Sequence, residues 1–268
     1  MEASRAWMPG RPKERSAEAS EPRFWEVDAA RGVAIIMVVV YHLIYDLGIF
    51  GGLTVQPTVG FWAFFADASA SAFAFLVGLS LTLSLRRAPV ARADRGDADR
   101  SVFGKYLRRG LRIFGYGMAI TAVFVVLDMG DVVFGMLHLI GASIVLAYPF
   151  LRLRLANVAL GATVVAVGLY VGSLGLSLPG AAGVLLSPLG ITPEGLFMPD
   201  YRPLLPWFGV VLIGAGAGNL LYAGRKPART TPALSRPLGF LGRNTLFIYL
   251  VHQPILIGLL LAFGIASL

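Results

Sequence analysis

Three histidines are the side chains best suited to proton transfer near neutral pH in this sequence, because imidazole gains and loses a proton in that range. They are His42, His138 and His252, and the 268 residues contain no other histidine. Each lies within a run of mostly apolar residues. Placing an ionisable side chain inside a bilayer costs about 2.5–3.5 kcal/mol or more, so each histidine is a candidate functional group.

Carboxylates and an arginine accompany His42 at helical spacing. Asp46 follows it by four residues, which places the two side chains on one helix face, and Asp67 lies in the next apolar run. A carboxylate bonded to one imidazole nitrogen would fix the tautomer and raise the basicity of the ring, so we expect Asp46 or Asp67 to orient His42. Arg31 precedes His42 by three helical turns, about 16 Å, where it could hold an anionic cosubstrate.

Structural interpretations of the same residues stay open. A histidine in a helical bundle can serve only as an interhelical hydrogen-bonding group. Arg31 could pair with Asp28 and anchor the end of its helix. Asp200 and Arg202 could form an ion pair at the membrane surface. The functional interpretation assigns substrate contacts to four residues, namely His138, Asp200, Arg202 and His252.

Membrane-spanning helices must position these groups. The chain is 56% hydrophobic and only 14% charged, with a mean hydropathy of +0.72, whereas soluble domains are about 25% charged. The apolar residues fall in blocks of about 20, the length that crosses a hydrocarbon core about 30 Å thick. We predict an all-α, polytopic membrane bundle of about seven helices, at 29–50, 59–85, 107–127, 131–150, 155–176, 203–222 and 237–263.

The distribution of positive charge predicts the orientation of the bundle. With the N-terminus in the cytoplasm, 21 of the 23 Lys and Arg residues fall in cytoplasmic segments, the exceptions being Arg31 and Arg202. Because cytoplasmic loops are enriched in these residues, we expect the N-terminus inside and the C-terminus outside. The net charge of +8 then reflects membrane orientation, and no nucleic-acid partner is expected. Residues 1–25 are polar and predicted to be a disordered cytoplasmic tail, and residues 26–268 to be the transmembrane domain.

Several kinds of site are absent from the sequence. The chain has no cysteine, which excludes disulfides, thiol nucleophiles and Cys-ligated metals. It has no Gly-rich phosphate loop and no GxSxG nucleophile elbow. His42 and Asp46 could supply two metal ligands, but no third is assured, so no metal is expected.

The first predicted helix carries the pieces V-D-x-x-R-G-x-A-I and Y-H. It resembles the first helix of the transmembrane acyltransferase superfamily, which includes the type-3 membrane O-acyltransferases and the catalytic domain of heparan-alpha-glucosaminide N-acetyltransferase with its bacterial relatives. Five further segments resemble those bacterial relatives, and with the first helix they touch six of the seven predicted spans. They are FAFLVGLSLTLSLRR, RRGLRIFGYG, FGMLHLIGASIVLAYPFLR, DYRPLLPWFGVVLIGAGAGN and LGFLGRNTLFIYLVHQPILI.

The resemblance implies acyl transfer from cytosolic acetyl-CoA to a hydroxyl or amino group of an extracytoplasmic glycan or similar acceptor. Type-3 O-acyltransferases carry an Arg and a His eleven positions apart on the first helix, as Arg31 and His42 are here. His42 would then be the base or the acyl-relay residue. The coenzyme would be held by arginines, namely Arg31, Arg108, Arg109 and Arg112. In the lysosomal heparan-alpha-glucosaminide N-acetyltransferase, the proposed active-site His lies in the loop after the first helix. Residues 47–58 of this sequence contain no His, so that assignment does not transfer.

The expected partners are acyl-CoA, the polar acceptor and the lipid of the cell's inner membrane, and a homo-oligomer stays open. Two other functions also stay open. A proton-coupled transporter would use the intramembrane His and Asp residues as a relay and would show flux without dependence on CoA. A non-catalytic membrane scaffold would use the same residues for packing and would not bind CoA.

Overall fold

The computed structural model describes residues 23–52, 54–87, 95–127, 132–195, 198, 200–228 and 230–265. All but the last three residues of the predicted cytoplasmic tail therefore lie outside the described part of the chain. Six helices in the described part are long and apolar enough to cross a membrane. They are α1 (Trp25–Ile49), α2 (Gly60–Arg87), α3 (Arg95–Val126), α5 (Ala156–Ser173), α7 (Leu204–Leu221) and α9 (Thr245–Ala262). This arrangement confirms the predicted all-α, polytopic bundle.

The fourth predicted span, 131–150, forms a shorter helix than expected. Helix α4 (Met136–Leu146) has 11 residues, about 16 Å at 1.5 Å per residue, and is followed by the 3₁₀ turn η1 (Tyr148–Phe150). Residues 132–135 before it are not helical, because the segment before α7 bonds this stretch instead. The amide of Arg202 donates to the carbonyl of Phe134 at 2.9 Å, and the carboxylate of Asp200 accepts from the amide of Met136 at 3.1 Å.

Two other predicted spans also differ in detail. The last, 237–263, consists of α8 (Arg236–Arg243) and α9, which are separated at Asn244, where φ is −101° and ψ is 15°. Helix α3 begins at Arg95 rather than at 107, and its apolar part is Arg100–Val126. The polar first turns of α3 therefore extend beyond the stretch that is apolar enough for lipid.

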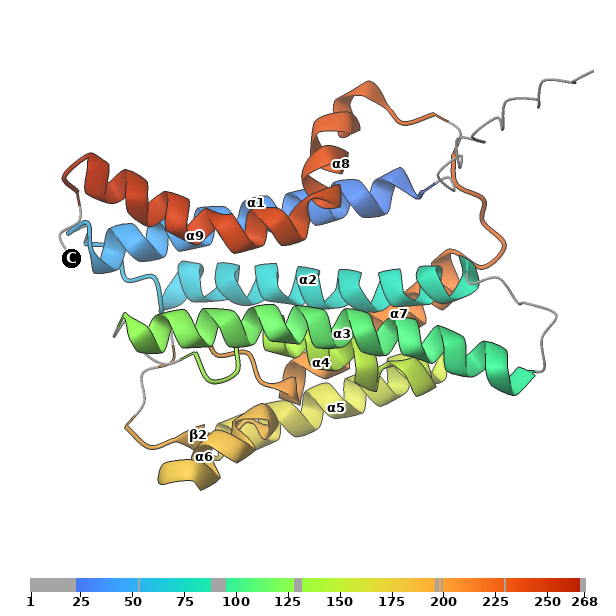
Figure 1. Cartoon of the computed structure of the whole chain (residues 1–268), viewed down its shortest axis with the longest axis horizontal. Coiled ribbons are helices and arrows are strands. Elements are labelled where there is room, and N and C mark those ends of the chain that lie inside the picture. Colours follow the sequence, from blue (N-terminus) through green and yellow to red (C-terminus); the bar gives the residue numbers. More distant parts are fainter. Residues whose placement is uncertain are drawn as a thin grey trace, which may run out of the picture.

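The stretch between the fifth and sixth predicted spans, 177–202, contains short regular elements. Strands β1 (Ser177–Leu178) and β2 (Thr192–Pro193) form a parallel pair around α6 (Gly180–Leu186) and the turn η2 (Ser187–Leu189). These elements lie at one end of the bundle, at the left of Figure 1. The start of α1 and the end of α2 lie at the opposite end, at the right, together with a further 3₁₀ turn, η3 (Ala233–Ser235), that leads into α8.

Helix α2 lies at the centre of the bundle and positions the elements around it. It packs against α7 and α1, and its buried side chains include Phe73, Leu79 and Leu81. Helices α1 and α9 run together along one side, and α5 runs along the opposite side against α7 (Figure 1). Helix α8 crosses α1 at a steep angle near the end where α1 begins (Figure 1).

Two glycines allow α8 to contact α1 backbone to backbone. A Cβ at Gly242 would collide with the carbonyl oxygen of Asp28, and a Cβ at Gly32 would collide with the carbonyl oxygen of Leu238. Small residues permit such close approach between helices in lipid. The contact holds α8 against the turn of α1 that carries Asp28.

We expect Gly242→Ala to lower the thermal unfolding midpoint in detergent, because forcing a methyl group into a filled contact costs about 1–3 kcal/mol. Intrinsic fluorescence would follow the transition. Gly172→Ala in α5 is the matched control, since a Cβ there meets nothing within 4 Å. Equal midpoints for the two variants would show that α8 can move away from α1 without loss of stability.

Candidate active site

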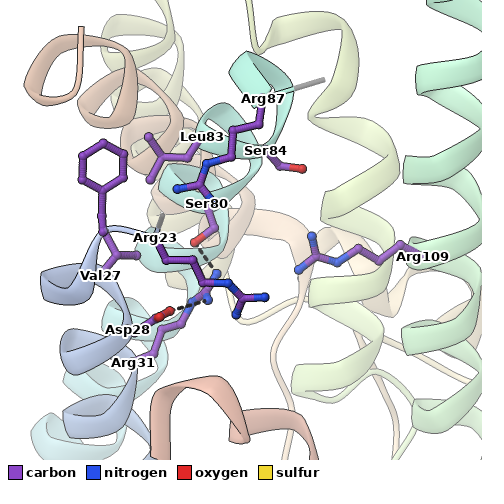
Figure 2. Close-up of a pocket in the computed structure, with 10 residues that line it drawn as sticks. Arg23, Val27, Asp28, Arg31, Ser80, Leu83, Ser84, Arg87 and Arg109 are labelled. Carbon is purple, nitrogen blue, oxygen red and sulfur yellow. Dashed lines mark hydrogen bonds and ion pairs between the residues drawn. The ribbon is translucent and has the colours of Figure 1, made fainter. Parts of the chain in front are cut away.

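A pocket of about 310 Å³ opens at the end of the bundle where α1 begins. Four arginines line it, namely Arg23, Arg31, Arg87 and Arg109, and Asp28 is its one carboxylate among the lining residues. They come from α1 and the residues before it, from α2 and from α3. Figure 2 shows Arg109 reaching in from one side, with Arg23 and Arg31 on the other. The excess of positive charge makes the pocket suited to a polyanion.

Arg31 is held on two sides within this pocket. Its Nη2 donates to the Ser80 hydroxyl at 2.5 Å, and its Nη1 lies 3.5 Å from Asp28 Oδ1 (Figure 2). The pairing of Arg31 with Asp28 is therefore present, and Arg31 also lines the arginine pocket, whereas its binding of an anionic cosubstrate stays a prediction. Because both contacts fix the plane of the guanidinium, the group is oriented before a ligand binds.

The three α3 arginines that were predicted to hold the coenzyme together with Arg31 differ in whether they line the pocket. All three are in the described part of the chain, and Arg109 lines the pocket. Arg108 bonds the carbonyl of Gly104 in its own helix at 3.3 Å, and Arg108 and Arg112 are exposed, as Arg109 also is. Neither Arg108 nor Arg112 is among the residues that line the pocket.

Sequence reasoning missed two arginines of the pocket, Arg23 and Arg87, because it attributed them to membrane orientation. A signal for one of them was present in the sequence. Ser80, Ser84 and Arg87 follow one another at spacings of four and three, which places them on one face of α2. All three line the pocket beside Arg31.

His42 and His252 form a pair between α1 and α9. Their ring centroids are 4.8 Å apart, with the planes at 82° to each other. Nδ1 of His42 lies 2.8 Å from the carbonyl of Val38, and Nδ1 of His252 lies 2.7 Å from the carbonyl of Tyr249. A carbonyl can only accept, so each Nδ1 carries a hydrogen, and Nε2 is the basic nitrogen of each neutral ring.

The carboxylates expected to orient His42 are bonded elsewhere. Asp46 accepts a hydrogen bond from Nε2 of Gln253 at 2.8 Å. Asp67 forms an ion pair with Arg202 at 3.3 Å. The Val38 carbonyl occupies the Nδ1 position of His42 that a carboxylate was predicted to take. Catalytic roles for Asp46 and Asp67 stay predictions.

Asp200 connects three parts of the bundle. Its Oδ2 accepts from the amide of Met136 at the start of α4 and from the hydroxyl of Tyr249 in α9, at 3.1 and 3.3 Å. Burial raises the pKa of the Asp200 carboxyl, although the Arg202 charge and these two hydrogen bonds act in the opposite direction. Since the Tyr249 carbonyl bonds His252, Asp200 supports the turn of α9 that carries the histidine pair.

His138 lies in a different environment from the other two histidines. Its Nδ1 accepts from the amide of Gly135 at 3.2 Å, which caps the start of α4. Its ring packs against Phe114 and Phe134, with centroids 5.0 and 5.7 Å away. In the described part of the chain no bond joins His138 to His42 or His252, so the contacts match the structural interpretation, and a substrate contact stays a prediction.

Arg202 and Asp67 form an ion pair at the end of the bundle opposite the four-arginine pocket. The guanidinium of Arg202 also lies over the ring of Trp207, 5.1 Å from its centroid. The Asp67 side chain is 62% exposed. Arg202 therefore pairs with Asp67 rather than with Asp200, and Trp207 adds an aromatic face beside this ion pair.

These features define a polytopic membrane protein with an arginine-lined pocket at one end of the bundle and two facing imidazoles between α1 and α9. The family model described as heparan-alpha-glucosaminide N-acetyltransferase, catalytic, matches residues 23–254. The match covers most of the chain, and the chain belongs to this family, which confirms the resemblance carried by its segments. At the level of the family it is a membrane acyltransferase. A search of curated proteins found no match, and neither did a search of solved structures.

Proposed function

We propose that the protein transfers an acetyl group from acetyl-CoA on the cytoplasmic side of the inner membrane to a hydroxyl or amino group on the far side. The acceptor would be an extracytoplasmic glycan or a similar polar molecule. The observation that carries this proposal is that Arg31, which lines the four-arginine pocket, and His42 lie on one helix, α1. The membership of the family supports the same type of reaction.

The four-arginine pocket would bind the phosphates of the coenzyme. Guanidinium groups form strong, charge-assisted hydrogen bonds with phosphate oxygens, and Arg31 is already oriented by Ser80 and Asp28. The pocket lies at the end of the bundle that the positive-inside rule assigns to the cytoplasm. His42 is about 16 Å further along α1, a distance that the extended pantetheine arm of CoA can reach.

His42 would act on the thioester at the end of this arm. In one route, its Nε2 takes the proton from the acceptor O–H or N–H as the oxygen or nitrogen attacks the thioester carbon. The C–S bond then breaks, and the proton passes from Nε2 to the departing sulfur. In the other route, Nε2 attacks the thioester carbon first, the C–S bond breaks and CoA leaves as the thiolate. The acceptor oxygen or nitrogen then attacks the acyl carbon, the bond from that carbon to Nε2 breaks, and the acceptor proton passes to the thiolate. In either route Nδ1 of His42 keeps its hydrogen and donates it to the Val38 carbonyl.

The acceptor would approach from the opposite end of the bundle, past Asp67, Arg202 and Trp207. The exposed carboxylate of Asp67 and the guanidinium of Arg202 offer an acceptor and a donor for hydrogen bonds with a polar molecule. Trp207 contributes an aromatic face beside them. His252, which faces His42, is connected to this end through Tyr249 and Asp200.

Transfer across a sealed membrane is the decisive test. The purified protein would be reconstituted into vesicles, with radiolabelled acetyl-CoA on one side and amino sugars or a bacterial glycan extract on the other. We expect label to appear in the acceptor across the membrane and free CoA to appear on the donor side. Movement of the sugar without acetylation would contradict the proposal and favour a transporter. Absence of both acetylation and acetyl-CoA binding would favour a scaffold.

A further inference from the structure

Asp46 and Gln253 meet in the seam between α1 and α9. Asp46 is fully buried, with an exposed fraction of 0%. Its Oδ1 accepts a hydrogen bond from Nε2 of Gln253 at 2.8 Å. The two remaining oxygens, Oδ2 of Asp46 and Oε1 of Gln253, are also buried, and neither has a hydrogen-bond partner in the described part of the chain.

An ionised Asp46 would make this arrangement unfavourable. Both unpartnered atoms would then be acceptors, so neither could bond the other, and each would be buried without compensation. Across the residues that the structure describes, no Lys, Arg or His forms an ion pair with Asp46. A buried carboxylate without a counter-charge and with a single hydrogen bond is strongly destabilising.

A single proton on Oδ2 of Asp46 would satisfy both atoms. The resulting O–H can donate to Oε1 of Gln253, while Nε2 of Gln253 continues to donate to Oδ1 of Asp46. A carboxylic acid and a primary amide have matching donor and acceptor groups for such a two-bond pair. The pair carries no charge, which suits a seam between two membrane-spanning helices.

We propose that Asp46 is a neutral carboxylic acid in the folded protein and that its two-bond pair with Gln253 holds α9 in register against α1, so that His252 faces His42. Asp46 is then a positioning residue rather than an orienting carboxylate for His42. The role in positioning rests on the proposed acyl transfer, whereas the protonation of Asp46 does not.

The location of the pair explains why its geometry matters for the two histidines. Asp46 lies one turn beyond His42 on α1, and Gln253 directly follows His252 on α9. Among the described elements α9 contacts mainly α1, and most of its length is not buried by the rest of the bundle. Few other contacts therefore fix the position of α9 along α1.

Infrared difference spectroscopy tests the protonation directly. The wild-type protein and Asp46→Asn would be compared in detergent at neutral pH, in H₂O and in D₂O. We expect the wild type to show a carboxylic-acid C=O band that shifts in D₂O and is missing from Asp46→Asn. If the substitution removes no carboxylic-acid band from the wild-type spectrum, Asp46 is ionised and the proposal is wrong. This measurement needs no acyl-transfer activity.

Substitutions test the positioning role. Asp46→Asn can keep both hydrogen bonds with Gln253, because its amide N–H replaces the acid O–H, whereas Asp46→Ala and Gln253→Leu lose both. We therefore expect Asp46→Asn to have a higher thermal midpoint and a higher turnover than Asp46→Ala and Gln253→Leu. In those two, misplacement of the histidines is expected to lower kcat by about 10²-fold, with the KM for acetyl-CoA unchanged because the arginine pocket is distant.

A different ranking would overturn the inference. If Asp46→Asn loses as much turnover as Asp46→Ala while staying folded, the negative charge of Asp46 is required and the neutral pair is excluded. If Gln253→Leu keeps wild-type kcat and stability, the pair does not position α9. If the wild type transfers no acyl group at all, the proposed function fails, but the infrared result still decides the state of Asp46.

Discussion

Replacing His42 by alanine is expected to lower acetyl transfer by about 10²–10⁴-fold, the range over which a positioned acid–base side chain contributes. Its Nδ1 hydrogen is fixed by the Val38 carbonyl, so Nε2 is the nitrogen available to the thioester and the acceptor. Alanine removes that nitrogen and leaves the arginine pocket intact. Transfer of radiolabel to a glycan extract would measure the loss.

Calorimetric binding of acetyl-CoA provides the control for this variant. Because His42 is three helical turns from Arg31, about 16 Å, the dissociation constant should remain close to that of the wild type. A folded His42→Ala protein with wild-type turnover would show that His42 is a structural residue of the α1–α9 seam. In that case, His252 would be the next candidate for the same role.

The helical bundle could be predicted because its signals are local. A block of about 20 apolar residues is needed to cross the bilayer, and a helix satisfies its own backbone in lipid. The starts of α4 and α9 could not be found in the same way. Helix α4 starts late because the Asp200 carboxylate, 64 positions away, bonds the amide of Met136. Such a contact leaves no trace in the apolar pattern.

The face that each helix turns toward its neighbours was also beyond sequence reasoning. In a membrane helix the lipid-facing and buried sides are both apolar, so periodicity does not separate them. The spacing of His42 and Asp46 suggested a direct contact, but side chains in helices lean toward the N-terminus. Nδ1 of His42 therefore meets Val38, while Asp46 bonds Gln253 of α9.

The arginine pocket could not be predicted from the sequence for a different reason. The positive-inside rule explains 21 of 23 basic residues by orientation alone, so it cannot distinguish a ligand-binding arginine from an ordinary cytoplasmic one. Arg108 and Arg109 are adjacent in sequence, yet only the second of the two lines the pocket. The distinction depends on which face of α3 turns toward α1 and α2.

The binding of acetyl-CoA should depend on the arginines that line the pocket. Removing Arg31 or Arg109 should weaken binding by about 10- to 100-fold, because hydrogen bonds to charged groups contribute about 1.5–3 kcal/mol each. Titration calorimetry in detergent would measure the dissociation constants. Added salt should weaken binding to the wild type more than to either variant, since each variant has lost one charge that salt would screen.

Arg108→Ala is the matched comparison for Arg109→Ala, because it removes the same side chain one position earlier on the same helix. Arg108 does not line the pocket, so its loss should change binding far less than the loss of Arg109. Equal effects of the two substitutions would mean that the coenzyme is attracted by the overall positive charge of this end of the bundle. A selective effect of the Arg31 and Arg109 substitutions would instead locate the phosphates of the coenzyme between α1, α2 and α3, at the end of α1 from which the helix leads to His42.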